Sequence, residues 1–151
     1  MEVHDGYVPD ERFRAFLETM PQACVELVVK TEDGVLLCKR AVEPAVWFWP
    51  GSRLYKGEQL EAAAHRVAQE ELGIEISLTE QLGIQSHFWS AEQTAEGVSR
   101  HTVNTVYLAT PVAPAVEIEL DDQHTAYRFV TEDSPAFHEY VREYLTEYDL
   151  V

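Results

Sequence analysis

Carboxylates and an arginine stand close together in one short segment, GEQLEAAAHRVAQEELG, residues 57–73. Glu70 and Glu71 follow Arg66 by about one helical turn. Successive residues of an α-helix are about 100° apart, so Val67 and Glu71 share one face, which Glu70 borders. Hard divalent cations such as Mg²⁺ take oxygen ligands, commonly from one or two carboxylates. The spacing alone leaves two interpretations open: a cation site, or an ordinary solvated helix face.

The surrounding pattern predicts a mixed α/β domain with a sheet between helices. Apolar residues three and four apart predict a helix at residues 9–20, and the charged segment predicts a helix at 58–72 that ends at Gly73. Ser134 as N-cap and Pro135 at the first helical position predict a last helix that runs to about residue 148. Apolar and β-branched runs predict strands at residues 23–31, 35–40, 74–78, 82–90, 101–109 and 124–130.

Turn residues separate these elements. Glu32, Asp33 and Gly34 form a hairpin signal, and Pro50 with Gly51 turns the chain into a loop at residues 51–57. We expect an exposed polar loop at 91–99. An acidic connection at 111–123 contains Pro111 and Pro114.

Length and composition exclude several classes of protein. The length of 151 residues predicts one domain spanning residues 1–151. A net charge of −16 argues against nucleic acid bound on a broad basic surface. No long apolar run is present and the N-terminus is polar, so we expect a cytoplasmic protein without a membrane partner, in which Cys24 and Cys38 are reduced. The acidic, lysine-poor surface suits a halophile, although an acidic mesophilic protein is the alternative.

The segment from Pro50 to Ile74 resembles the Nudix box, G-x5-E-x7-R-E-U-x-E-E-x-G-U with U an aliphatic residue. Arg66 matches its arginine and Glu58 its first glutamate, in register with the Glu-Glu pair that ends at Glu71. The order of elements also resembles that of Nudix hydrolases. The resemblance implies a single Nudix hydrolase domain, with an α/β/α sandwich that holds a mixed β-sheet between helices.

Two positions depart from the box. Ser52 replaces its first glycine, and Val67 replaces the glutamate that follows the arginine. In Nudix enzymes that glutamate belongs to the acidic cluster that holds metals and helps to activate water. Because valine can neither bind Mg²⁺ nor accept a proton, either the activity is lost or the base lies elsewhere.

One Nudix branch, the GDP-mannose mannosyl hydrolases, lacks this glutamate and remains active. Its members attack the anomeric carbon of the sugar, release GDP, and use one divalent ion with a histidine base. Outside the box the chain is similar to this branch at FWPGSR from Phe48, at Gly83 and His87, and at DQHTAYR from Asp122, so the resemblance covers about residues 8–148.

The resemblance implies a metal ligand set and a base. Glu71, the carbonyl of Gly51 and the side-chain oxygen of Gln123 would hold one Mg²⁺ ion, with Mn²⁺ as a substitute. His124 matches the general base. A neutral imidazole can take a proton from water at neutral pH. Glu70 departs from the branch, and either binds a second ion or pairs with Arg66.

Three arginines match substrate-side positions. Arg53 and Arg66 would face the diphosphate leaving group, and Arg40 would be a further arginine on the substrate side. For Arg66 an alternative is open, since it matches an arginine that often orients the helix by pairing with Glu58 or Glu70.

Three further residues match substrate-binding positions. Glu26 matches an acid near the sugar or the base, and His87 a second histidine of the site, while Asn104 falls near a substrate-contacting tyrosine of the branch. Each has a plain alternative, since Glu26 can face solvent and His87 can be a satisfied core histidine.

Three functions follow from these matches. The first is Mg²⁺-dependent hydrolysis of a GDP-sugar, of the GDP-mannose or GDP-glucose type, to GDP and free hexose. The second is a Nudix pyrophosphatase that cleaves a nucleoside diphosphate derivative at phosphorus, against which Val67 counts. The third is an inactive nucleotide-binding domain, against which Gln123, His124 and Arg53 count. The expected partner is a small nucleotide sugar rather than a nucleic acid, and related enzymes suggest a homodimer.

Overall fold

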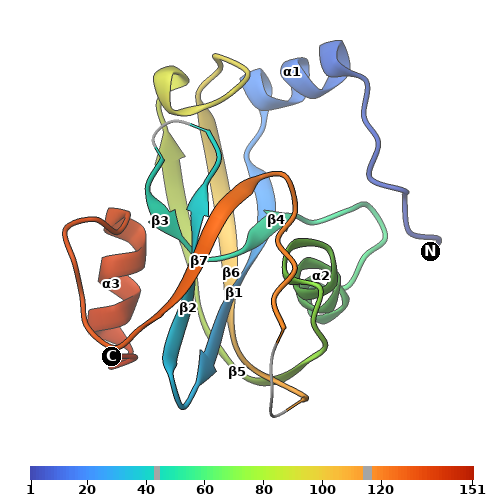
Figure 1. Ribbon diagram of the computed structural model, residues 1–151. Helices are drawn as coiled ribbons and strands as arrows, with labels where there is room; N and C mark the ends of the chain where they lie inside the picture. The colour runs from blue at the N-terminus through green and yellow to red at the C-terminus, as the bar shows by residue number, and fades with distance from the viewer. Residues whose placement is uncertain (43–44, 114–116) are drawn as a thin grey trace.

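A computed structural model describes residues 1–42, 45–113 and 117–151, with a sheet held between two helices (Figure 1). Helix α2 covers one face of the sheet and α3 the other, so the predicted α/β/α sandwich is confirmed. The elements in chain order are α1 (Asp10–Thr19), β1 (Gln22–Thr31), β2 (Gly34–Arg40), β3 (Trp47–Phe48), β4 (Gly51–Arg53), α2 (Leu60–Val67), the π-helical turn η1 (Ala68–Leu72), β5 (Ile76–Trp89), the 3₁₀ turn η2 (Ala91–Gln93), β6 (Arg100–Pro111), β7 (His124–Val130) and α3 (Glu139–Glu147).

The sheet is mixed, because β1 runs parallel to β6 while its other pairings are antiparallel. The strand order is β3-β2-β1-β6-β5, with β4 beside β1 and β7 beside β2. Along one edge β1 pairs with β4 at residues 24–26 and with β2 only at 30–31. Strand β2 therefore separates from β1 soon after the hairpin, and β4 takes the place beside the first half of β1.

Side chains of β1 alternate between two apolar cores, as the two-residue period of a strand requires. Val25 and Leu27 pack with α2, whereas Val28 packs with residues of α3. Val67 of α2 is fully buried in the first core. The position that carries a glutamate in the box therefore serves packing in this chain.

Several predicted elements are confirmed. Helix α1 and strands β1, β2, β6 and β7 match the predicted ranges within a few residues. Gly73 ends the charged helix in a left-handed conformation, with φ of 66°. Both cysteines are free, and Cys38 is buried. Part of the predicted connection at 111–123, including Pro114, lies outside the described residues.

Other predicted boundaries were wrong. The two strands predicted at 74–78 and 82–90 are the single strand β5, whose register shifts twice against β6, and these irregularities interrupt its pattern. The loop predicted at 51–57 begins with the short strand β4. The charged helix begins at Leu60 and widens into a π-helical turn at Ala68.

The last helix begins later than the Ser134–Pro135 signal predicted. The Ser134 hydroxyl accepts a hydrogen bond from the Ala136 amide, so these residues form a turn before the helix. His138 is the actual N-cap, because its ring accepts a hydrogen bond from the Tyr140 amide. A histidine N-cap is uncommon, and the serine supplied the stronger signal.

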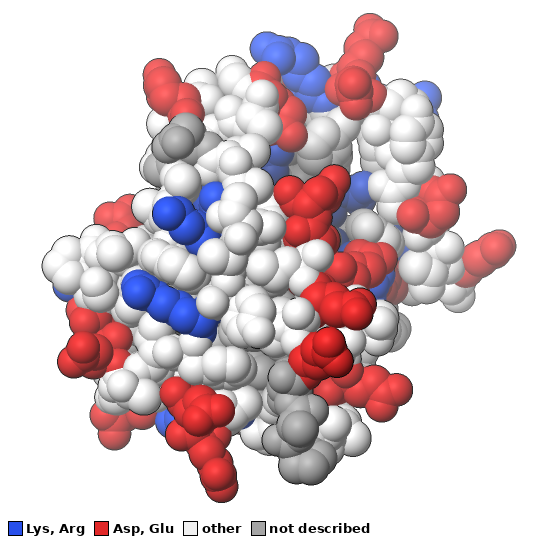
Figure 2. All heavy atoms as spheres, in the orientation of Figure 1, with Lys and Arg blue, Asp and Glu red and all other residues white. Residues whose placement is uncertain are grey.

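The surface carries the excess of acidic residues that the composition predicts. Asp and Glu side chains spread over the face in Figure 2, while Lys and Arg form small separate groups. None of the described helices is long and apolar enough to cross a membrane.

Substitution of two glycines with positive φ, Gly34 and Gly97, can distinguish the cost of backbone strain from the cost of steric overlap. At Gly34, with φ of 121°, an added Cβ would lie 2.3 Å from the Val130 carbonyl oxygen. At Gly97, with φ of 67°, an added Cβ would have no neighbouring heavy atom within 4 Å. We expect Gly34→Ala to lower the free energy of unfolding by about 3 kcal/mol and Gly97→Ala by about 1 kcal/mol, measured by urea denaturation. Equal losses would show that backbone conformation alone decides the effect.

Candidate active site

The π-helical turn η1 gives its two adjacent glutamates different surroundings. The Glu71 residue is 5% exposed, whereas the side chain of Glu70 is 54% exposed and pairs with Arg66 at 3.2 Å. A π-helical turn within an α-helix commonly marks a functional site. Here it directs one carboxylate into the protein and leaves the other in solvent.

Glu71 meets two side chains from the start of β7 and the segment just before it. One ligand atom each from Glu71, Asp121 and His124 lie within 4.8 Å of one another. His124 Nδ1 is 2.7 Å from Asp121 Oδ1, and His124 Nε2 is 3.8 Å from Glu71 Oε1. The chain thus brings together Glu71 and His124, two predicted site residues that are distant in sequence.

Asp121 was not predicted to belong to this site. It stands in the acidic connection, two residues before Gln123, where several carboxylates carry no individual signal. The one sequence feature that distinguishes it is its spacing of three residues from His124. That spacing becomes informative only once the chain direction before β7 is known.

The environment of Glu71 fits a divalent cation. Its Oε2 atom is buried without a hydrogen-bond partner. Burial, and then the nearby charge of Asp121, raises the pKa of Glu71 to about 8, although the amide of Gly51 acts in the opposite direction. A cation between the two carboxylates would satisfy the free oxygen and remove the repulsion. Oxygen donors of this kind suit Mg²⁺ and similar hard ions.

His124 is oriented by Asp121. When Nδ1 donates its proton to the Asp121 carboxylate, Nε2 keeps a free lone pair that faces Glu71. The Gln123 side chain is exposed, while its backbone carbonyl accepts a hydrogen bond of 2.9 Å from the Ala41 amide. This hydrogen bond fastens the segment before β7 to the end of β2.

Gly51 lies between the metal side and the substrate side of the predicted site. In β4 it pairs with Glu26 of β1, and an added Cβ would lie 3.0 Å from Glu26 Cγ. Its amide also acts on the Glu71 carboxylate. The absence of a side chain at Gly51 therefore lets β4 pass closely between two carboxylates.

The three residues predicted to contact substrate lie together in one buried cluster. Glu26 accepts hydrogen bonds from Asn104 Nδ2 and, at 2.8 Å, from Trp49 Nε1. His87 Nδ1 is 3.5 Å from Glu26 Oε1, and the His87 ring stacks on Tyr140 of α3 with centroids 3.7 Å apart. Glu26 therefore does not face solvent, and neither nitrogen of the fully buried His87 has a hydrogen-bond partner. Trp49 and Tyr140 are further members of this cluster that were not among the predicted site residues.

Arg66 is held by neighbouring groups. It donates to both oxygens of Glu58, at 2.6 and 3.0 Å, to the Arg53 carbonyl at 3.0 Å, and to Glu70 at 3.2 Å. Its guanidinium also lies 3.7 Å from the Tyr55 ring centroid. Burial acts to raise the pKa of Glu58, but these hydrogen bonds hold it below its usual value. This geometry favours the orienting alternative for Arg66 over direct phosphate contact.

The other two predicted arginines have fewer acceptors. Arg53 donates to the Gly6 carbonyl of the N-terminal segment. Arg40 stands opposite His124 in the β2–β7 pairing, which places its backbone beside the base. Its guanidinium lies 5.6 Å from the Trp89 ring centroid, and its Nη1 is buried without an acceptor.

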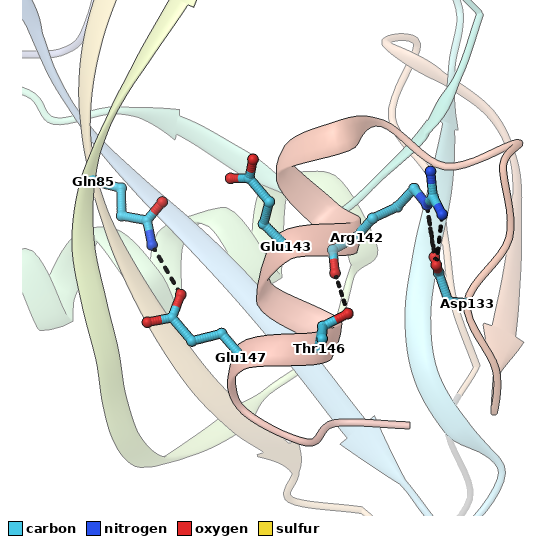
Figure 3. Close-up of a pocket in the computed structure, with 6 residues that line it drawn as sticks. All are labelled: Gln85, Asp133, Arg142, Glu143, Thr146 and Glu147. Atoms are coloured by element: carbon cyan, nitrogen blue, oxygen red, sulfur yellow. Dashed lines mark hydrogen bonds and ion pairs between the residues drawn. The ribbon is translucent and has the colours of Figure 1, made fainter.

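A separate groove lies between β5 and α3 (Figure 3). Arg142 there binds Asp133, and Gln85 donates to Glu147. The groove contains none of the predicted site residues, and its donors and carboxylates are largely paired with one another. The candidate site is therefore the Glu71–Asp121–His124 group with the arginines beside it.

Comparisons with known proteins identify the family of the chain. A family model for the NUDIX domain matches residues 20–147. The chain is 36% identical over 148 residues to the low-salt glycan biosynthesis protein Agl8 of Haloferax volcanii, covering 94% of this chain and 91% of that protein.

Solved structures share the fold. A MutT protein from Methanosarcina mazei Go1 superposes with a TM-score of 0.67 at 20% identity, over 85% of this chain and 94% of that one. A MutT NUDIX hydrolase from Burkholderia pseudomallei gives a TM-score of 0.65 at 27% identity, over 84% and 97%. Since the family model spans most of the chain, the chain belongs to the Nudix family of hydrolases.

Proposed function

We propose that the protein hydrolyses a GDP-sugar, of the GDP-mannose or GDP-glucose type, to GDP and free hexose by attack of water on the anomeric carbon. The observation that carries the proposal is the position of His124 beside Glu71, in a chain whose Val67 is buried in the core. His124 is then the base that remains available. The similarity to a glycan biosynthesis protein supports a sugar-containing substrate.

Each residue of the group has a separate role in this proposal. Glu71 and Asp121 offer carboxylate oxygens to one Mg²⁺ or Mn²⁺ ion, with the Gly51 carbonyl and the Gln123 side chain as further ligands by resemblance. When bound, the ion supplies positive charge that stabilises the diphosphate leaving group. Asp121 also keeps the His124 ring in one orientation through its hydrogen bond to Nδ1.

His124 Nε2 accepts a proton from water while the water oxygen forms a bond to the anomeric carbon. The bond between that carbon and the diphosphate oxygen breaks, and GDP leaves with the electron pair. Arg53 and Arg40 bind the departing diphosphate. Glu26, His87 and Asn104 are assigned to recognition of the substrate, which requires their buried cluster to open toward it. The alternative, attack on phosphorus as in a pyrophosphatase, has less support because Glu70 is exposed and paired with Arg66.

The same proposal includes the cellular setting. Free cysteines support a reducing cytoplasm, and the acidic surface with a Haloferax relative supports a high-salt one. A homodimer is proposed from the resemblance alone.

The proposed function predicts that the bond between the anomeric carbon and the diphosphate oxygen is the one that breaks. With GDP-mannose, Mg²⁺ and ¹⁸O-labelled water, we expect the label in the free sugar, measured by mass spectrometry. His124→Gln should lower kcat by roughly a hundredfold to ten-thousandfold, the usual contribution of a general base.

Two results would contradict this prediction. Label in a phosphate group would mean attack on phosphorus and favour the pyrophosphatase alternative. A wild-type protein that turns over neither GDP-mannose nor GDP-glucose would be a binding domain, and Val67 would then mark the loss of catalysis.

The two adjacent glutamates give a matched test of the metal site. Mg²⁺ at 100 times its dissociation constant should stabilise the wild type by about 2.7 kcal/mol, seen as a rise in Tm. Glu71→Gln should abolish this rise, because it removes the buried ligand, whereas Glu70→Gln should keep it. Without Mg²⁺ the Glu71→Gln variant should be as stable as the wild type or more stable, because burial, and then the charge of Asp121, disfavours an ionised side chain here and an amide carries no charge. A rise in Tm lost only in Glu70→Gln would assign the ion to the exposed glutamate.

Asp121 and Asp122 give a matched test of the orientation of His124. Asp121→Asn should lower kcat about tenfold to a hundredfold at saturating Mg²⁺ and leave KM nearly unchanged, because the imidazole loses its fixed orientation. Asp122→Asn removes the same charge from an exposed neighbour and should change neither constant. Equal effects of both substitutions would mean that Asp121 acts only through its charge.

A further inference from the structure

Three arginines stand at the ends of β2, β4 and β6, next to the rings of Phe13 and Trp89. The ring of Phe13 from α1 lies 5.6 Å from the Arg53 guanidinium and 5.8 Å from that of Arg100. Arg100 stands opposite Trp89 in the β5–β6 pairing, and the Trp89 ring also packs with Arg40. Arg100 therefore joins the two arginines that the sequence had already singled out.

The donors of this group are incompletely satisfied. Among the described residues Arg40 forms no ion pair, and its Nη1 is buried without an acceptor. Arg100 pairs with Glu96 through Nη2, while its Nε is also buried without an acceptor. Buried donors that lack an acceptor cost free energy, so native proteins rarely retain them without a reason.

Arginine donors without an acceptor are unexpected in a chain that is so rich in carboxylates. The chain has 27 acidic residues and 11 lysines and arginines, so carboxylates outnumber cations by more than two to one. Burial, and then the charge of Arg100, lowers the pKa of Arg40. An anion between the two guanidinium groups would satisfy both free donors and remove their repulsion.

Because Arg66 is occupied by other protein groups, a phosphate must be bound by other arginines. Its guanidinium is held by Glu58, Glu70 and the Arg53 carbonyl, so it has little capacity for a phosphate. The backbone of Arg40 pairs with that of His124, so Arg40 stands at the end of β2 that lies beside the start of β7, where the proposed base is located.

We propose that Arg100, together with Arg40, binds the diphosphate group of the substrate. Arginine suits this role because its planar guanidinium can donate two parallel hydrogen bonds to phosphate oxygens. The identity of the diphosphate as part of a nucleotide sugar rests on the proposed function. The assignment of Arg100 rests on the unsatisfied donors and on its position beside Arg40.

Binding of inorganic pyrophosphate tests the arginines apart from catalysis. Isothermal titration calorimetry without divalent ions should detect pyrophosphate binding to the wild type. Arg100→Gln and Arg40→Gln should each weaken it about tenfold or more, as expected for hydrogen bonds to a charged group. Arg100→Lys should restore binding only in part, because it keeps the charge and loses the paired donors.

Arg142→Gln is the matched control. Arg142 is an exposed arginine bound to Asp133 in the groove of Figure 3, and its loss changes the net charge by the same amount. We expect its pyrophosphate affinity to equal that of the wild type. A similar loss in Arg142→Gln and Arg100→Gln would reduce the effect to net charge and overturn the proposal.

Two further outcomes separate this inference from the proposed function. Unchanged pyrophosphate binding in a folded Arg100→Gln protein, or no binding by the wild type, overturns the arginine site even where GDP-mannose is cleaved at carbon. Weakened binding in that variant, with ¹⁸O found in phosphate, upholds the arginine site and overturns cleavage at carbon. Circular dichroism establishes that each variant is folded. If Arg100→Gln does not fold, Arg100→Lys carries the same test, and wild-type affinity in that variant overturns the proposal.

Discussion

The buried ion pair between Arg66 and Glu58 is the interaction on which the arrangement of the site depends. Their side chains are only 15% and 5% exposed, so removal of either partner would leave a charge poorly solvated. The same guanidinium binds the Arg53 carbonyl and thereby joins α2 to β4. Because β4 pairs with β1 and carries Gly51, this connection fixes the backbone that meets the Glu71 carboxylate. Arg66 thus acts by holding the site together.

Packing and chemistry compete for the same helix face. Val67 fills the core between α2 and β1, and it removes a carboxylate that the family places there. The chemical groups that remain come from two elements, with Glu71 from η1 and His124 from the start of β7. Strand β7 places His124 at this site because it pairs with β2, whose register shifts between Lys39 and Arg40 at the level of His124. A site built from two elements depends more on the sheet than one built on a single helix.

The sequence predicted what depends on local spacing. Glu71, the cap at Gly73 and the sandwich order follow from patterns within short segments, and the structure confirms the cap and the order. Asp121 and Arg100 escaped prediction because their significance depends on which distant segments meet, and a lone acid or arginine carries no local signal. The late start of α3 has a different cause, since Ser134 has the chemistry of a cap but its hydroxyl closes a turn instead. In all three cases, Asp121, Arg100 and the start of α3, the outcome depends on tertiary contacts that local sequence patterns do not reveal.

The negative charge of the protein opposes binding of the proposed anionic substrate. A net charge of −16 would repel the proposed nucleotide-sugar substrate, and this repulsion extends over the Debye length of about 10 Å at 0.1 M salt. At 1 M salt the Debye length falls to about 3 Å, so the repulsion is screened, and the attraction between exposed opposite charges is screened as well. Only groups that contact the anion in partly buried surroundings keep their attraction under both conditions. The buried donors of Arg40 and Arg100 would meet this requirement in the proposed diphosphate site, whereas a broad basic surface would lose its attraction in salt.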